Sequence, residues 1–148
     1  MAAMIDEGLE LLSEDECLQL MATAAVGRIG VTIGALPAIF PVNFAVQDGS
    51  IYFRTGVGTK LAAAAHRSVV AFEVDRVDPF EHSGWSVLAI GTANQVTDPE
   101  ELAALSNLRF GPWADGERAH LVRIPVEVVS GRRIIHGRGP DGRRGPGR

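Results

Sequence analysis

The chain switches between two hydrophobic periods along its length. Apolar residues first recur every three or four positions, at Cys17, Leu20, Met21 and Ala24. That spacing is typical of a helix with one buried face. The run Ser13-Glu14-Asp15-Glu16 precedes it and matches a capping box, in which the serine hydroxyl accepts from the Glu16 amide. We therefore expect a helix from about Glu14 to Ala25.

From Arg28 onward the period becomes two, which indicates half-buried strands. The predicted strands cover residues 28–33, 40–46, 51–55, 69–75, 85–96 and 121–129, with further strand material at 132–135. Asp48-Gly49 lies between two alternating runs and predicts a tight hairpin. Pro41 cannot donate a ladder hydrogen bond, so it should mark an edge, a bulge or a break.

Two shorter helices are expected between these strands. Thr59 is a suitable N-cap for an alanine-rich helix over residues 61–65. Asp98-Pro99-Glu100-Glu101 begins another, with Leu102, Leu105 and Leu108 as its buried stripe. About six mostly antiparallel strands and three short helices predict a mainly β fold, a small barrel or open barrel.

Composition and charge narrow the class of protein. The 148 residues fit one domain, which we place at residues 1–136. Residues 137–148 contain no apolar side chain and should form a disordered tail. The tail carries a net charge of +3, which leaves about −7 on the rest and argues against a nucleic-acid partner. With one cysteine, no signal peptide and no long apolar run, a cytoplasmic protein without a membrane partner is expected.

The chain has thirteen arginines but one lysine, Lys60, which follows a glycine-rich loop at the start of a predicted helix. Glycines let the backbone approach an anion closely, and helix N-termini present unpaired amides. Arg54, Thr55 and Thr59 add further donors, so the segment could bind a phosphate. The same residues also fit an ordinary surface lysine on a capped helix. The spacing differs from a Walker A loop, so nucleoside triphosphate hydrolysis is not expected.

The other side chains that could bind a metal or act in catalysis do not predict a functional site. The four histidines are too far apart in sequence to suggest a metal cluster, and no metal is expected. Cys17 lies on an apolar helix stripe, where a packed thiol is the better interpretation. Glu73 and Asp75 fit a solvated strand face or partners for arginine. No residue is assigned a catalytic role.

Several blocks of sequence together resemble the pyridoxamine 5′-phosphate oxidase-like, FMN-binding split-barrel family. The resemblance covers about residues 10–135. It depends on the order and spacing of the capped first helix and of residues 27–30, 40–44, 48–61, 72–75 and 84–87.

The resemblance implies a six-stranded antiparallel split β-barrel that forms a homodimer, with cofactor clefts at the subunit interface. It places Phe53, Arg54, Thr55, Thr59 and Lys60, with Leu61 beside them, at the cofactor phosphate and ribityl chain. It places Phe40, Pro41, Val42 and Asn43 along the ring, and brings Trp85 and Ser86 from the partner subunit. FMN is the implied cofactor, with deazaflavin F420 as the alternative.

Three functions follow as hypotheses. The first is an FMN- or F420-dependent oxidoreductase acting on a small organic molecule, in which the flavin carries out the redox chemistry. The second is a non-catalytic flavin- or haem-binding or sensing protein with the same pocket. The third is a purely structural interaction domain. Vitamin B6 oxidation is not expected, because Arg133 and His136 do not have the spacing of the longer oxidases.

Overall fold

The computed structural model describes residues 5–6, 8–110 and 119–134. The described residues form nine strands: β1 (Ile5–Asp6), β2 (Leu9–Leu11), β3 (Val26–Ile33), β4 (Leu36–Gln47), β5 (Ser50–Gly56), β6 (Ser68–Asp78), β7 (Ser83–Gln95), β8 (Ala119–Pro125) and β9 (Val128–Ile134). The helices are α1 (Glu14–Ala22), α2 (Lys60–Ala64) and α3 (Pro99–Ala104). The predicted tail at 137–148 lies outside the described residues, and the extent of the domain stays a prediction.

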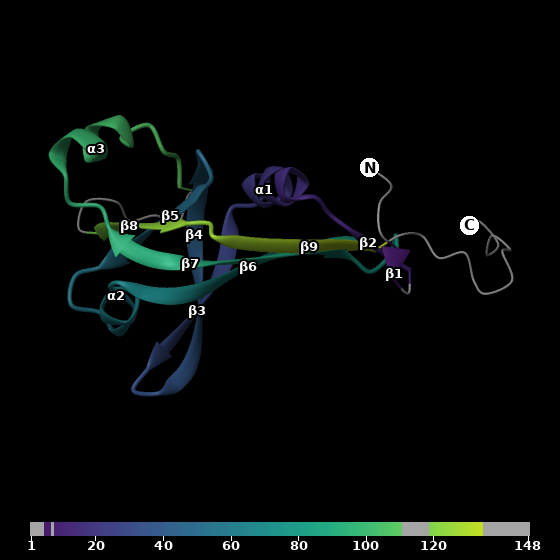
Figure 1. The fold of residues 1–148 in the computed structure, drawn as a ribbon, viewed down its shortest axis with the longest axis horizontal. Coiled ribbons are helices and arrows are strands. Elements are labelled where there is room, and N and C mark those ends of the chain that lie inside the picture. The colour runs from purple at the N-terminus through teal and green to yellow at the C-terminus, as the bar shows by residue number, and fades with distance from the viewer. Residues whose placement is uncertain (1–4, 7, 111–118, 135–148) are drawn as a thin grey trace, which may run out of the picture.

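Six of the strands close into a ring. Each of β7, β6, β3, β4, β5 and β8 pairs antiparallel with the next, and β8 returns to β7 through Asn94↔Arg123 and Gln95↔Val122. The remaining strands β1, β2 and β9 extend the sheet from β7 as a wing, seen at the right of Figure 1. The expected six-stranded split barrel is confirmed.

The ring encloses one hydrophobic core. Alternate residues of β3 to β8 point inward, among them the fully buried Ile29, Ile51, Phe53, Phe72 and Ile124. Two helices add to this core, with Cys17 and Met21 from α1, and with Leu61 of α2 and its C-cap Ala65. The two helices lie on different sides of the ring in Figure 1. Cys17 is a packed thiol, as predicted, and burial raises its pKa.

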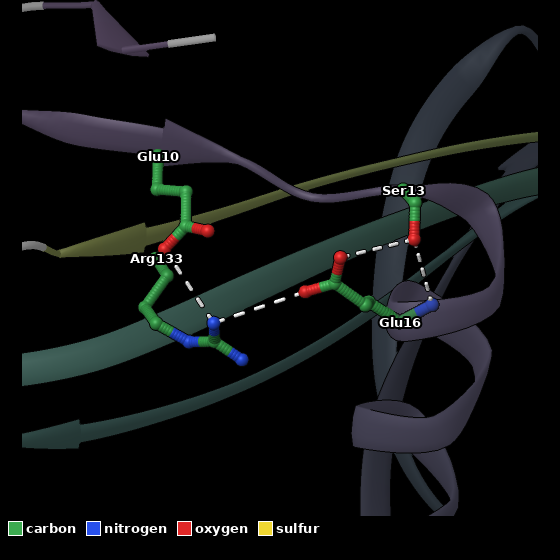
Figure 2. Close-up of polar contacts among 4 residues, drawn as sticks. All are labelled: Glu10, Ser13, Glu16 and Arg133. Atoms are coloured by element: carbon green, nitrogen blue, oxygen red, sulfur yellow. Dashed lines mark hydrogen bonds and ion pairs between the residues drawn. The ribbon is translucent and has the colours of Figure 1, made fainter. Parts of the chain in front are cut away.

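The first helix is anchored through its cap, which Figure 2 shows. The Glu16 amide donates to the Ser13 hydroxyl at 3.2 Å, so the predicted capping box is confirmed. The Glu16 carboxylate also accepts from that hydroxyl and lies 3.8 Å from the guanidinium of Arg133 on β9. Arg133 contacts Glu10 of β2 as well, at 3.5 Å. Arg133 therefore joins the wing to the start of α1.

Three details of the predicted elements are wrong. The first helix ends at Ala22 rather than Ala25, because Thr23 and the following residues turn into β3. The strands β1 and β2 were not predicted, since two or three residues carry no readable period. The stripe of the third helix is only partly buried: Leu105 is buried, whereas Leu102 is exposed. Among the described residues, no helix is long and apolar enough to cross a membrane.

Candidate functional site: the split between two strands

The ladder between β4 and β5 stops part-way along both strands. It runs from Gln47↔Ser50 to Phe44↔Phe53. Beyond that pair, residues 36–43 of β4 pair with β3, and residues 54–56 of β5 pair with β8. Among the described strands neither segment pairs with the other, so two strand edges face the same opening. We call this opening the barrel split.

Pro41 lies on the open edge of β4. The Phe44 amide donates to the Ala25 carbonyl at 3.3 Å, on the β3 side of the strand. Because backbone groups alternate sides along an antiparallel strand, the nitrogen of Pro41 and the backbone groups of Asn43 face the split. Proline is tolerated there since no ladder hydrogen bond is lost. Of the three predicted meanings of Pro41, an edge is the one that the structure confirms.

Two buried polar atoms near the split lack a partner. In the described part of the chain, Asn43 Oδ1 and Thr55 Oγ1 are both inaccessible to solvent and make no hydrogen bond. A buried polar group left unsatisfied costs about 1–3 kcal/mol. The two atoms belong to the two strand segments that diverge at the split. Both atoms could accept from a ligand hydroxyl or ring N–H, and the Thr55 hydroxyl could also donate to a phosphate, so these residues fit a flavin nucleotide.

The segment between Thr55 and Lys60 is held compactly at the end of β5. The Thr59 hydroxyl donates to the Gly56 carbonyl at 3.0 Å and accepts from the Ala62 amide at 3.0 Å. Thr59 is therefore the N-cap of α2, as predicted. Lys60 is the first residue of that helix and is exposed to solvent. Its ammonium group is thus accessible to an anion from solvent.

Arg54 points to the other side of β5 from Phe53 and Thr55. Its guanidinium lies 5.0 Å from the centre of the Phe110 ring, a cation–π contact. Phe110 itself packs with Leu108 against a second small core of Tyr52, Leu105 and Leu121. Arg54 therefore lies between the split and the segment that follows α3.

The other predicted site residues divide into two groups. Phe53 is fully buried and Phe40, Val42 and Leu61 pack against the core, so Phe53 could reach a ligand only through its backbone. Trp85 and Ser86 lie in the first part of β7, where they pair with Arg133 and Arg132 of β9. That part of β7 pairs with the wing strand β9, whereas α2 lies at the far side of the ring in Figure 1. A single chain does not bring Trp85 and Ser86 to Lys60.

Comparison with known proteins gives the family. The profile of the pyridoxamine 5′-phosphate oxidase family matches residues 13–133, which is most of the chain. The chain belongs to the pyridoxamine 5′-phosphate oxidase family. The resemblance inferred from the sequence blocks is therefore confirmed.

Three relatives each match more than four fifths of this chain. The uncharacterized protein Rv0080 of Mycobacterium tuberculosis is 40% identical over 129 residues, 84% of each chain. The structure of the FAD binding protein from Mycobacterium smegmatis superimposes with a TM-score of 0.72 at 38% identity, covering 84% of this chain and 97% of that one. A protein of unknown function, DIP1874 from Corynebacterium diphtheriae, gives a TM-score of 0.73 at 34% identity, over 87% of this chain and all of that one.

Sequence reasoning missed one feature next to the split. A cavity of about 650 Å³ lies between the end of α1, residues 44–46 of β4 and residues 107–110. The three segments are far apart in sequence, so no local motif could have predicted it. Among the described residues, no group of three or more histidine, cysteine or carboxylate side chains could hold a metal ion.

Apart from the split, the protein has a cluster of charged side chains on the outer face of its sheet. The Arg28 guanidinium lies 3.2 Å from Glu73 and 3.0 Å from Asp75. Both carboxylates thus pair with an arginine, one of the two predicted roles. Burial and then the neighbouring Asp75 raise the pKa of Glu73 above its ordinary value, and Arg28 opposes this.

Replacing Glu73 with glutamine should reduce the pH dependence of stability. A carboxyl whose pKa is raised on folding stabilises the fold below its unfolded-state pKa and loses that contribution as pH rises through the folded-state value. Wild-type protein should therefore lose more unfolding free energy than Glu73→Gln between pH 4 and pH 7, measured by urea unfolding. Parallel pH curves for the two proteins would contradict this assignment.

Proposed function

We propose that this protein binds a flavin nucleotide at the barrel split and uses it as an oxidoreductase. The observation that carries the proposal is the pair of unsatisfied buried atoms, Asn43 Oδ1 and Thr55 Oγ1, on the diverging strands. The FAD binding protein from Mycobacterium smegmatis, 38% identical to this chain, supports a flavin as the ligand. Among flavin nucleotides we favour FAD for that reason, with FMN and F420 as the other cofactors to be tested.

The residues around the split have separate roles in this proposal. Lys60 and the Thr55 hydroxyl bind the phosphate next to the ribityl chain. Hydrogen bonds to this charged group are stronger than those between neutral groups. The backbone of residues 40–43 and the Asn43 side chain orient the ring along the open edge of β4. The flavin supplies the hydride or electron transfer, and the protein supplies orientation, electrostatics and access. This division of roles requires no side-chain nucleophile.

The proposal includes a homodimer, because a second copy would be needed to bring Trp85 and Ser86 to the cofactor. The outer apolar face supports it: Ile39, Gly30, Ala71, Ile90 and Val128 lie opposite one another across five strands. Val69 and Leu88 flank this row. Ile39, Val69 and Val128 are 72%, 68% and 58% exposed, which is unusual for large apolar side chains gathered on one face.

Placing a charge on the outer apolar face should dissociate the dimer. Val69→Asp puts a carboxylate on a side chain that is exposed in one chain, so the single chain should still fold. Light scattering after gel filtration should give a dimer for the wild type and a monomer for Val69→Asp. Val69→Thr, which keeps the shape, is the matched control and should remain a dimer. A wild-type monomer at tens of micromolar would contradict the proposal.

Cofactor titration followed by reduction tests the function itself. The purified protein, freed of any flavin, is titrated with FAD, FMN and F420 while its visible spectrum is recorded. We expect a flavin to bind, and NADH or NADPH to reduce it without air faster than the free flavin. Failure to bind any of the three at tens of micromolar would overturn the proposal. Tight binding without faster reduction would identify a flavin carrier instead of an enzyme.

A further inference from the structure

The 650 Å³ cavity beside the split has a volume within the range of small-molecule sites. Its wall is built from three parts: the end of α1 at residues 22–25, residues 44–46 of β4, and residues 107–110. The last part is fixed in place by Leu108 and Phe110, which pack against the small core around Tyr52. Arg123 donates to the Tyr52 hydroxyl at 2.9 Å and lies 3.6 Å from Glu101, which ties α3 to the barrel.

The lining of the cavity combines apolar and polar groups. Val46, Leu108 and Phe110 provide apolar surface for a planar ring, and Asn107 provides an amide that can donate and accept. The C-terminal end of α1 carries partial negative charge, which favours an amino group over an anion. Arg109 provides a positive charge on the opposite wall. An amino-substituted aromatic base with an attached anion fits this distribution.

The cavity lies next to two residues that border the proposed flavin site. Phe110 lines the cavity and also lies under the Arg54 guanidinium, 5.0 Å from it. Phe44 lines the cavity and is the last residue of β4 paired with β5 before the split begins. Because Arg54 points to the opposite face of β5 from Thr55, a ligand that reaches from the split into the cavity would pass around the open edge of β5 and along Arg54.

We propose that this cavity binds the adenosine half of FAD, and that Arg54, which lies over the Phe110 ring, and Arg109, which lines the cavity, bind the diphosphate. This inference rests on the proposed function, since it assumes that the flavin half lies at the split. FMN ends at one phosphate, which Lys60 and Thr55 bind. FAD adds a second phosphate and an adenosine, which match the second arginine and the aromatic wall. The chain should therefore prefer FAD over FMN.

The ratio of the FMN and FAD dissociation constants tests the inference, measured by calorimetric titration of the flavin-free full chain. We expect wild-type protein to bind FAD at least tenfold more tightly than FMN. Arg109→Ala should reduce this preference several-fold or more by weakening FAD while leaving FMN unchanged. Lys60→Ala is the matched control, because it removes a positive charge from the site of the first phosphate. It should weaken the binding of both cofactors by a similar factor and leave the ratio of their dissociation constants unchanged.

A second variant fills the cavity without removing a charge. Ala45→Phe puts a ring into the space from β4 and should also weaken FAD selectively. Retention of FMN binding shows that each variant is folded. Equal wild-type affinities for FMN and FAD, or an unchanged ratio in both Arg109→Ala and Ala45→Phe, would overturn the inference while the flavin site stands. If wild-type protein bound neither FMN nor FAD, this result would instead contradict the proposed function.

Discussion

Replacing Lys60 with alanine should weaken the binding of FMN and FAD by about tenfold to a hundredfold, or roughly 1.5–3 kcal/mol, the range for a hydrogen bond to a charged group. Lys60 begins α2 just after the Thr59 cap, and its exposed ammonium lies where the phosphate is proposed to bind. Fold stability should change little because the side chain is in solvent. Equilibrium titration of flavin absorbance measures the effect.

Two matched variants separate a specific contact from the loss of one positive charge. Arg67→Ala removes an exposed cation from the turn that follows the same helix and should leave flavin affinity within about twofold of wild type. Lys60→Arg keeps the charge and should recover part of the affinity. Equal weakening by Lys60→Ala and Arg67→Ala would show that only net charge matters.

Of the substitutions that we predict to affect folding, Gly91→Ala should cause the largest decrease in the free energy of unfolding. A Cβ there would overlap the Pro125 carbonyl oxygen and come within 3.0 Å of the Ile124 side chain. Both neighbours belong to β8, the strand that closes the ring against β7. Because a strand backbone cannot move aside as a flexible side chain can, we expect Gly91→Ala to cost about 3 kcal/mol, the upper end of overpacking effects. Urea unfolding measures this difference.

Gly30→Ala is the matched control, since Gly30 also lies in a ring strand. A Cβ at Gly30 would meet the Ala71 Cβ at 3.6 Å, an ordinary van der Waals distance. Alanine also has less conformational entropy to lose than glycine in a strand. Gly30→Ala should therefore be within about 1 kcal/mol of wild type. If Gly91→Ala were as stable as wild type, this result would contradict the close contact between Gly91 of β7 and the end of β8.

The ring strands were predictable because each carries its own signal. Asp48 and Gly49 both have positive φ values, 50° and 74°, as expected for the two central residues of a tight hairpin turn. The alternation in β3, β6 and β7 indicated their inward faces directly. By contrast, β1 and β2 exist because they pair onto β9, a tertiary contact that leaves no period in two or three residues.

The candidate site was predictable only in part. Lys60 stood out as the one lysine, and Thr59 and Pro41 had local signals of a cap and an edge. The divergence of β4 from β5 after Phe44 depends on how the ring closes, so the burial of Asn43 Oδ1 and Thr55 Oγ1 could not be inferred. The cavity beside the split joins residues 22–25 and 44–46 to residues 107–110, which follow more than sixty positions later, and for the same reason Arg109 carried no signal.

The affinity of the protein for FMN compared with riboflavin tests the central claim most directly. The two ligands share the ring and ribityl chain and differ only in the phosphate that Lys60 and Thr55 are proposed to bind. Titrations of flavin-free protein at one ionic strength should give at least tenfold tighter binding of FMN. Equal affinities for the two ligands would contradict a phosphate site at the end of β5.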